Sequence, residues 1–281
     1  MTGDEMIRDE PYGSFKLANF RDVDGSGKAA AYTDFLNRFA ADRREMIDVG
    51  LDLLALRPGS SVLDVGCGPG AIIPLLASRV ETNGRVVGID PSRELVAEAR
   101  RRFIGSGLPV EISVGNAQTL DFADATFDAA RTDRVLVYVS DLRQAVLELA
   151  RVTKSGGHVV VTEPDMGASM VDSPDAETTR AVLAGVCDEF PNAWAGRRLR
   201  ALFLDAGLID AEVRAFSIMH TQFAQWSERM GIDEVLEKIT GSGRISAATA
   251  KAWLDGLRKR DAAGRFFAAN TLIMVSGTKA G

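Results

Sequence analysis

The sequence predicts an α/β fold with a doubly wound parallel sheet, and three observations support this prediction. Short apolar runs alternate with amphipathic stretches of helical periodicity along most of the chain, as in sheets that carry helices on both faces. The run Val62-Leu63-Asp64-Val65-Gly66-Cys67-Gly68-Pro69-Gly70 is typical of a buried strand that ends in a tight turn. A periodic stretch from Ala71 to Arg79 follows directly. A strand, a glycine turn and the N-terminus of a helix together form a nucleotide-type pocket.

The composition excludes several classes of protein. The 281 residues carry 33 basic and 39 acidic side chains, for a net charge of −6, so we expect no nucleic acid partner because phosphate binding needs a clustered basic surface. The two cysteines, Cys67 and Cys187, provide neither a disulfide framework nor a zinc-binding pair. The sequence begins without the apolar segment of a signal peptide, and no run approaches the roughly 18 apolar residues that span a bilayer. We therefore expect a cytoplasmic protein without a membrane partner.

Residues 1–56 are predicted to form an N-terminal helical arm. The first 28 residues are polar and glycine-rich, and their aromatic side chains indicate a segment that docks onto the protein. Helical periodicity then covers about Ala29 to Leu56. The run Arg57-Pro58-Gly59 ends this helix, because proline and glycine both interrupt helical structure.

Residues 57–218 are predicted to form the core, in which strands and helices alternate. We expect strands at Val62–Val65, Arg85–Ile89, Val110–Val114, Phe127–Arg131 and His158–Thr162. Helices are expected between them at Ile72–Arg79, Arg93–Ile104 and Leu142–Val152. The stretch from Pro164 to about Asn192 is expected to be irregular, and a helix near Arg197–Ala206 follows it.

The last part of the chain is predicted to add two long strands and a cap. The strands lie at about Ala211–Ile218 and Phe266–Ser276, and the segment between them is much longer than a hairpin requires. We interpret residues 219–264 as a helical cap and residues 265–281 as the final core strand. The apolar side chains of this cap are Trp226, Met230, Leu236, Ile239, Trp253 and Leu257. Together with the Pro164–Asn192 stretch, the cap is expected to cover the substrate side.

The glycine turn distinguishes between families of nucleotide-binding proteins. The dinucleotide fingerprint is G-x-G-x-x-G, whereas the spacing here is G-x-G-x-G, with Asp64 two residues before the first glycine. A carboxylate at this place would repel a pyrophosphate but would suit a ligand with an ammonium and a sulfonium group. The run resembles motif I of the class I S-adenosylmethionine (SAM)-dependent methyltransferases, of the type-11 and ubiquinone/menaquinone kind. This resemblance implies a seven-stranded Rossmann-like sheet with an antiparallel last strand, SAM as cofactor and S-adenosylhomocysteine (SAH) as product.

Further positions at strand ends fit a SAM site. Asp90 ends the second strand, where a carboxylate could bind a ribose diol or could cap the next helix, although Ser92 could also provide the cap. The resemblance implies that Asn116 and Ala117 hold the adenine, with an Asx turn as the alternative for Asn116. It also implies that Arg131 and Thr132 lie beneath the methionine part. The predicted cofactor-binding residues are Asp64, Gly66, Cys67, Gly68, Gly70, Asp90, Pro91, Asn116, Ala117, Arg131 and Thr132.

No catalytic residue can be assigned, and His220, Tyr138 and Asp133 are weak candidates. His220 begins the cap and could act as a general base, whereas His158 starts a buried strand and is expected to be structural. Asp133 could line the methyl-transfer side or form a structural pair with Arg134. The run from Glu148 to Val152, followed by Gly156 and Gly157, resembles the family's signature after the core.

Other side chains have two interpretations. Tyr12, Tyr32, Arg43 and Arg44 belong to the arm and could reach the ligand, although a solvated helix face also explains the two arginines. Cys67 is better explained as a small turn residue than as a nucleophile. No metal is expected, because Asp133 and Asp165 lack the Asp-Asn partner that metal-dependent catechol methylation uses.

The function that these residues imply is methyl transfer to an oxygen, nitrogen or carbon atom of a small molecule. The Trp-, Met- and Phe-bearing cap favours an apolar or aromatic acceptor, and the resemblance suggests natural-product or quinone-like chemistry. One alternative is a SAM-binding protein that transfers no methyl group, such as a cyclase or a regulatory protein. A less favoured alternative is an NAD-dependent oxidoreductase, which the glycine spacing opposes. A homodimer is compatible with the cap helices.

Overall fold

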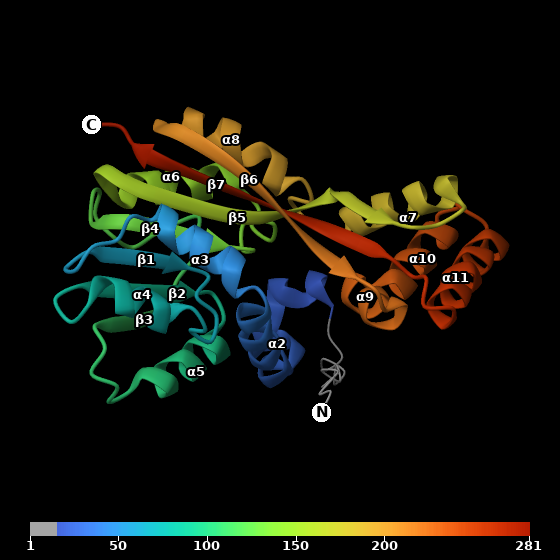
Figure 1. Ribbon diagram of the computed structural model, residues 1–281, viewed down its shortest axis with the longest axis horizontal. Helices are drawn as coiled ribbons and strands as arrows, with labels where there is room; N and C mark the ends of the chain where they lie inside the picture. The colour runs from blue at the N-terminus through green and yellow to red at the C-terminus, as the bar shows by residue number, and fades with distance from the viewer. Residues whose placement is uncertain (1–15) are drawn as a thin grey trace, which may run out of the picture.

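The computed structural model describes residues 16–281, whose seven strands form one mixed sheet (Figure 1). The strand order is β3-β2-β1-β4-β5-β7-β6. Neighbouring strands from β3 to β5 are parallel, whereas β7 is antiparallel to both β5 and β6. The strands are β1 (Ser61–Val65), β2 (Arg85–Asp90), β3 (Val110–Val114), β4 (Phe127–Asp133), β5 (Thr153–Val171), β6 (Leu208–His220) and β7 (Ala268–Lys279). The predicted sheet with an antiparallel last strand is confirmed.

Helices cover both faces of the sheet because strand side chains alternate between two apolar clusters. Val62 packs with α2, α3 and α4, whereas its neighbour Leu63 packs with α6 and α8. The helices are η1 (Leu17–Asp22), α1 (Val23–Ser26), α2 (Ala29–Asp42), α3 (Arg44–Leu53), α4 (Ile73–Val80), α5 (Arg93–Phe103), α6 (Leu142–Val152), α7 (Ala176–Asp188), α8 (Ala195–Asp205), α9 (Phe223–Met230), α10 (Ile232–Gly241) and α11 (Ala247–Ala262). Among residues 16–281, no helix combines the length and apolar character needed to cross a bilayer.

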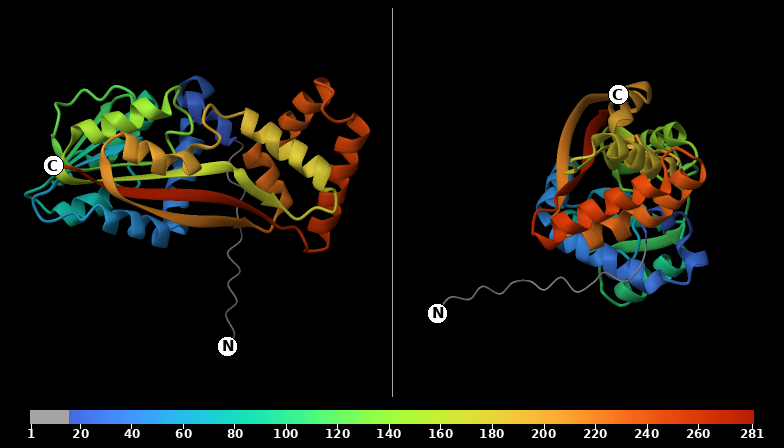
Figure 2. Two further views of the ribbon diagram at one scale, coloured as in Figure 1. Left: turned by 90° about the horizontal axis from the view of Figure 1, so that it is seen from above. Right: turned by 90° about the vertical axis from the view of Figure 1, so that its right-hand side faces the viewer.

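The three longest strands extend from the core to a separate group of helices. Strands β5, β6 and β7 run past the parallel part of the sheet to α7, α9, α10 and α11, as Figures 1 and 2 show. These helices form their own apolar cluster around Trp226 and Trp253, together with Phe266, Ala268 of β7 and Met166 of β5. The indole nitrogen of Trp253 in α11 donates to Thr179 Oγ1 of α7 at 2.9 Å. This hydrogen bond connects the last helix of the group to its first.

The expectation of an irregular stretch from Pro164 to Asn192 is wrong. Strand β5 continues to Val171, and α7 begins after Asp175, whose side chain accepts from the backbone of Thr178. Pro164 lies opposite Leu272 of β7, while β4 has already ended opposite Thr162. Beyond Thr162, no strand among residues 16–281 pairs with β5 on the side of β4. A proline is tolerated there because its missing N–H leaves no strand partner without a hydrogen bond.

The single helix expected from Ala29 to Leu56 is also wrong. The chain leaves helical geometry at Arg43, with φ −117° and ψ 27°, so α2 and α3 are separate helices. Because of this break, the two helices contact different parts of the protein. Phe35 and Phe39 of α2 line a cavity, whereas Leu51 of α3 packs against the sheet. Other element ends differ from the predictions by a few residues.

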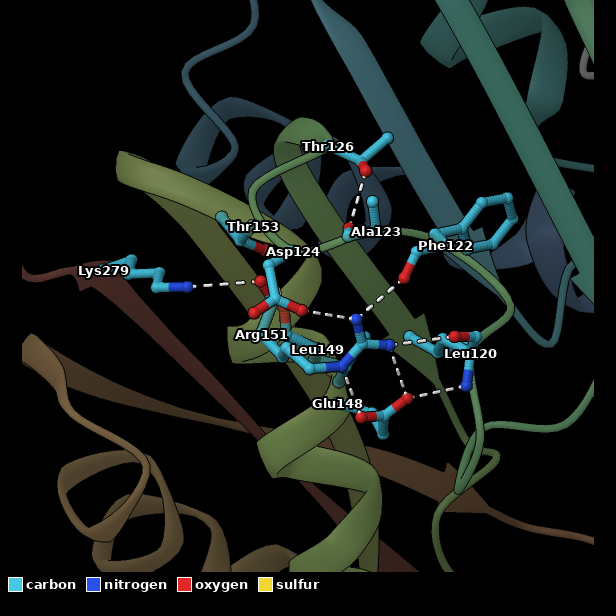
Figure 3. Close-up of polar contacts among 10 residues, drawn as sticks. All are labelled: Leu120, Phe122, Ala123, Asp124, Thr126, Glu148, Leu149, Arg151, Thr153 and Lys279. Atoms are coloured by element: carbon cyan, nitrogen blue, oxygen red, sulfur yellow. Dashed lines mark hydrogen bonds and ion pairs between the residues drawn. The ribbon is translucent and has the colours of Figure 1, made fainter.

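A polar network around Arg151 ties the end of α6 to the loop before β4 (Figure 3). The guanidinium makes two hydrogen bonds to Glu148, at 2.7 and 2.8 Å, and one to Asp124 at 2.8 Å. It also donates to the backbone carbonyls of Leu120 and Phe122. Glu148 in turn accepts from the backbone N–H of Leu120 at 2.7 Å. The network therefore fixes the loop between β3 and β4 onto α6.

We expect Arg151→Lys to lower the free energy of unfolding by about 2 kcal/mol, because an ammonium group cannot replace the planar fork that makes five hydrogen bonds. The measurement is chemical denaturation. Arg143→Lys on the exposed face of the same helix is the control and should change the stability by less than about 0.5 kcal/mol. Equal effects of the two substitutions would contradict a structural role for the network.

Candidate functional site

A cavity of about 370 Å³ lies where the ends of the parallel strands meet the arm and the cap. One end is bounded by the glycine turn after β1 and by the ends of β2 and β3. The other end is bounded by aromatic and sulfur-containing side chains. The first end includes Gly66, Gly68, Asp90, Pro91, Asn116 and Ala117, and the second includes Phe20, Phe35, Tyr138, Met166, His220, Trp226 and Met230. A single cavity therefore has a polar, nucleotide-type end and an apolar end.

Asp90 is the main polar group at the first end. Its Oδ2 accepts from the backbone N–H of Gly68 and its Oδ1 from that of Ser92, each at 2.9 Å. Ser92, and not Asp90, caps α5 by accepting from Leu95. Each carboxylate oxygen keeps a lone pair for a ligand hydroxyl. Burial raises the pKa of Asp90 to about 6, although its two backbone donors oppose this shift.

The glycine turn packs closely against neighbouring side chains, which would clash with a Cβ atom at two of its positions. Gly66, Gly68 and Gly70 have positive φ values of 76°, 53° and 79°. A Cβ on Gly66 would lie 2.0 Å from Cγ2 of Val135, and one on Gly70 would lie 2.5 Å from the ring of Phe103. Gly66 and Gly68 line the cavity, whereas Gly70 provides close packing of α5.

Beneath the turn, Asp64 is paired inside the protein and does not line the cavity. Its carboxylate lies 2.7 Å from the guanidinium of Arg131, and both residues are buried. Arg131 also contacts Asp133, which pairs with Arg134 at 2.9 Å. Burial raises the pKa of Asp64, and the Arg131 charge opposes this effect. Of these four residues, only Asp133 and Arg134 line the cavity. Their ion pair is the structural role that the sequence offered as an alternative for Asp133.

Glu163 holds the turn after β4 in place. It was not among the residues predicted from the sequence. This fully buried carboxylate of β5 accepts from the backbone N–H groups of Val135, Leu136 and Val137, at 2.7 to 3.0 Å. Burial raises the pKa of Glu163 to about 8 against the effect of these donors. The one sign of its role in the sequence is that this acidic residue directly follows an apolar strand. Because of this contact, Val135 and Tyr138 keep fixed positions on the cavity wall.

The side of the cavity near β3 carries the predicted adenine residues. Ala117 is buried, and Asn116 is exposed at the cavity edge. Asn116 Oδ1 accepts from the backbone N–H of Gln118 at 2.9 Å, which is the Asx turn that was its alternative. A carbonyl oxygen has two lone pairs, so this turn leaves one of them for a ligand.

Asp24 attaches the arm to the protein next to Asp90. In the sequence, Asp24 was predicted only to be part of a turn. The Asp24 carboxylate accepts from Ser92 Oγ and from the backbone N–H groups of Arg93 and Glu94. It therefore binds the N-terminal end of α5 from outside the helix, where a negative charge is favoured. Leu17, Phe20 and Val23 of the same segment line the cavity, so this contact keeps the arm over the site.

The apolar end of the cavity contains three groups that could affect an acceptor. His220 Nε2 lies 2.9 Å from Asn270 Oδ1. Burial, together with the charges of Arg229 and Arg43, lowers the pKa of His220 to about 4. Burial raises the pKa of Tyr138, which therefore stays protonated. The indole N–H of Trp226 is buried and donates to no acceptor among residues 16–281.

The remaining predicted residues lie around the cavity without lining it. Cys67 is buried behind the turn, and burial raises the pKa of its thiol well above the usual range. Thr132 is buried at the end of β4. Tyr32 is buried in α2, and Arg44 pairs with Asp48 on an exposed helix face. Tyr12 lies outside the described residues. The described part of the chain holds no group of three or more His, Cys, Asp or Glu side chains placed to bind a metal ion.

Comparison of the sequence with protein families matches residues 63–161 to a methyltransferase domain of type 11. An uncharacterised 37.1 kDa protein from a transposon of Streptomyces fradiae is 38% identical, over 97% of this chain and 78% of its own length. An uncharacterised methyltransferase of Schizosaccharomyces pombe is 31% identical, over 71% of this chain and 74% of its own length. A demethylmenaquinone methyltransferase of Symbiobacterium thermophilum is 35% identical, but over 38% of this chain and 43% of the enzyme.

Comparison of the structure with solved structures shows the same fold. The YcgJ protein of Bacillus subtilis superposes with a TM-score of 0.59 at 20% identity, over 83% of this chain and 97% of its own. At this identity the likeness concerns the arrangement of helices and strands.

We expect Asp24→Ala to loosen the arm, because three donors at the start of α5 and on Ser92 lose their acceptor. Amide hydrogen exchange should become faster at Arg93, at Glu94 and in residues 17–28, and the free energy of unfolding should fall by about 1 kcal/mol. Asp34→Ala on the exposed face of α2 is the matched control. Unchanged exchange in residues 17–28 of the Asp24 variant would show that other contacts hold the arm.

Proposed function

Because the chain belongs to the class I SAM-dependent methyltransferases, we propose that it transfers a methyl group from SAM to an oxygen, nitrogen or carbon atom of a small, apolar or aromatic molecule. The observation that carries this proposal is the single cavity that joins the Asp90 end to the apolar end at Trp226 and Met230. Two molecules bound at these ends would meet inside the protein, where side chains exclude water.

The residues at the first end fit SAM. The Asp90 carboxylate has lone pairs available for a ribose diol, and Gly66 and Gly68 bring backbone without side chains to the cavity wall. Asn116 and Ala117 border the place proposed for the adenine. SAM, when bound, supplies a methyl group that its sulfonium already activates. The chain therefore has to bind and align two molecules and to exclude water, which together can account for most of the rate enhancement.

The second end supports an apolar or aromatic acceptor. Phe20, Phe35, Tyr138, Trp226 and Met230 offer rings and a thioether for contact with a flat molecule. The partial similarity to a demethylmenaquinone methyltransferase supports a quinone-like acceptor, and natural-product acceptors fit the same chemistry.

His220 is the best placed of the three catalytic candidates. It lines the cavity, and its lowered pKa keeps the imidazole neutral at pH 7, which leaves a ring lone pair unprotonated but makes the ring a weaker base than a free histidine. Asp133 is held between Arg131 and Arg134, and the phenol of Tyr138 is protonated. We therefore propose His220 as the proton acceptor for substrates that must lose a proton.

The test of this function is calorimetric titration with SAM, SAH and NAD, followed by an assay of SAH formation with a panel of phenols, quinols and amines. We expect binding of SAM and SAH in the micromolar range, no binding of NAD, and SAH formation with at least one acceptor. NAD binding alone would overturn the proposal. Binding of SAM without turnover by any acceptor would favour a SAM-binding protein that transfers no methyl group.

We expect the affinity for SAH to depend on pH through Asp90. The carboxylate accepts ribose hydroxyls best when ionised, and its pKa is about 6. The affinity should therefore be constant above about pH 7 and fall below pH 6 by up to about tenfold per pH unit. The measurement is titration calorimetry between pH 5 and 7.5.

Asp90→Asn should weaken SAH binding by roughly tenfold or more at pH 7 and should remove the pH dependence. Asp121→Asn at an exposed position is the control and should leave both properties unchanged. An Asp90→Asn protein that keeps the same pH dependence would exclude Asp90 as its source.

A further inference from the structure

A chain of hydrogen bonds connects three neighbouring strands at the apolar end of the cavity. His220 at the end of β6 contacts Asn270 Oδ1 of β7 through Nε2 at 2.9 Å. The Asn270 amide nitrogen donates to Ser169 Oγ of β5, also at 2.9 Å. His220 and Asn270 both line the cavity. These polar groups stand among Trp226, Met230 and other apolar side chains, where polar groups need partners.

The neighbours of Asn270 determine which way its amide points. Its nitrogen lies 3.8 Å from the sulfur of Met230 as well as near Ser169. A thioether sulfur accepts hydrogen bonds and does not donate them, so the NH₂ group belongs on this side. The amide oxygen then faces His220. Because that oxygen only accepts, the Nε2 atom of His220 must carry the proton.

We propose that Asn270 is a positioning residue that holds His220 in the tautomer protonated at Nε2, leaving the Nδ1 lone pair to accept a proton from the methyl acceptor. Nδ1 forms no hydrogen bond with residues 16–281, so it is the ring atom that His220 can offer to a ligand in the cavity. The partner of one ring nitrogen commonly sets the function of the other. The tautomer follows from geometry alone, and only the identity of the proton donor rests on the proposed function.

The charges around His220 favour the neutral ring. Arg229 of α9 and Arg43, between α2 and α3, both oppose a second proton on the imidazole, and Asn270 of β7 adds no charge. The ring therefore takes a proton only as the reaction consumes the O–H or N–H bond of the acceptor. The proton then moves to Nδ1, while the acceptor atom keeps the electron pair that forms its bond to the methyl carbon. The S–CH₃ bond would break at the same time, with its electron pair remaining on the sulfur of the departing SAH.

This arrangement specifies the class of acceptor. A weakly basic aromatic amine is neutral at pH 7 and carries a lone pair that can attack the methyl carbon before any proton is lost. A phenol, enol or quinol is neutral at pH 7 and must lose a proton from oxygen. It also fits among the rings of Phe20, Tyr138 and Trp226. We therefore expect the acceptor to carry a weakly acidic hydroxyl group on a flat, apolar frame.

The test uses the fact that the sequence contains two histidines, His158 and His220. Protein labelled with ¹⁵N at the histidine rings gives two sets of imidazole signals in long-range ¹H–¹⁵N spectra, and His158→Gln assigns them. We expect His220 to show the Nε2-protonated pattern at pH 7 without any added ligand. Asn270→Asp should keep this tautomer and raise the pKa of His220 by about one unit or more, because a carboxylate favours the charged ring.

Asn270→Leu should produce a mixture of tautomers, whereas Thr271→Val, the control on the same strand, should leave the His220 signals unchanged. An Nδ1-protonated His220 in the unaltered protein would overturn the proposal. So would an unchanged tautomer ratio in a folded Asn270→Leu protein. If that variant does not fold, Asn270→Asp decides, because no rise in the His220 pKa contradicts the contact. Failure of SAM binding would overturn the proposed function instead, without changing the tautomer.

Discussion

The hydrogen-bonded ribbon of β5, β7 and β6 is the constraint on which the site depends. It runs from the pairing of His158 with Thr278 in the core to that of Val171 with Ala268 beside the cap helices. Between Asp165 and Met170 the register of β5 shifts, and irregularities of this kind redirect side chains. Ser169 reaches Asn270 from this segment. The ribbon carries the apolar end of the cavity, and its pairing with β4 joins it to the parallel strands that carry the other end.

Three buried carboxylates at the carboxyl ends of the strands are stabilised in three ways. Asp64 has the guanidinium of Arg131, Asp90 has two backbone donors, and Glu163 has three. Buried charges are costly unless they are paired or hydrogen-bonded. Here each partner also fixes a loop or a strand end beside the cavity. Asp90 is the one of the three that remains accessible to a ligand, so the same interactions that stabilise the fold leave one carboxylate for binding.

The sequence predicted the sheet, because the alternation of strands and helices is a local pattern. Six of the predicted cofactor-binding residues line the first end of the cavity: Gly66, Gly68, Asp90, Pro91, Asn116 and Ala117. The glycine spacing, the Asp90 position and the Ser92 cap lie within short stretches that alternate as the fold requires. The extension of β5 through Pro164 could not be predicted, because it depends on pairing with β7, about a hundred residues later in the chain. Asn270 was missed for the same reason. The role of this asparagine depends on its hydrogen bonds with His220 and Ser169, which belong to two other strands.

The place of β7 in the strand order also affects how the protein is made. The strand formed by the last residues of the chain lies between β5 and β6, and β6 pairs with no other strand among residues 16–281. A ribosome releases the N-terminal part first, so the parallel half of the sheet can form while β6 still lacks its partner. Until β7 has been synthesised, β5 and β6 each expose an unpaired edge of the kind that promotes aggregation. The apolar end of the cavity is completed, and these edges are protected, only when β7 pairs with both strands.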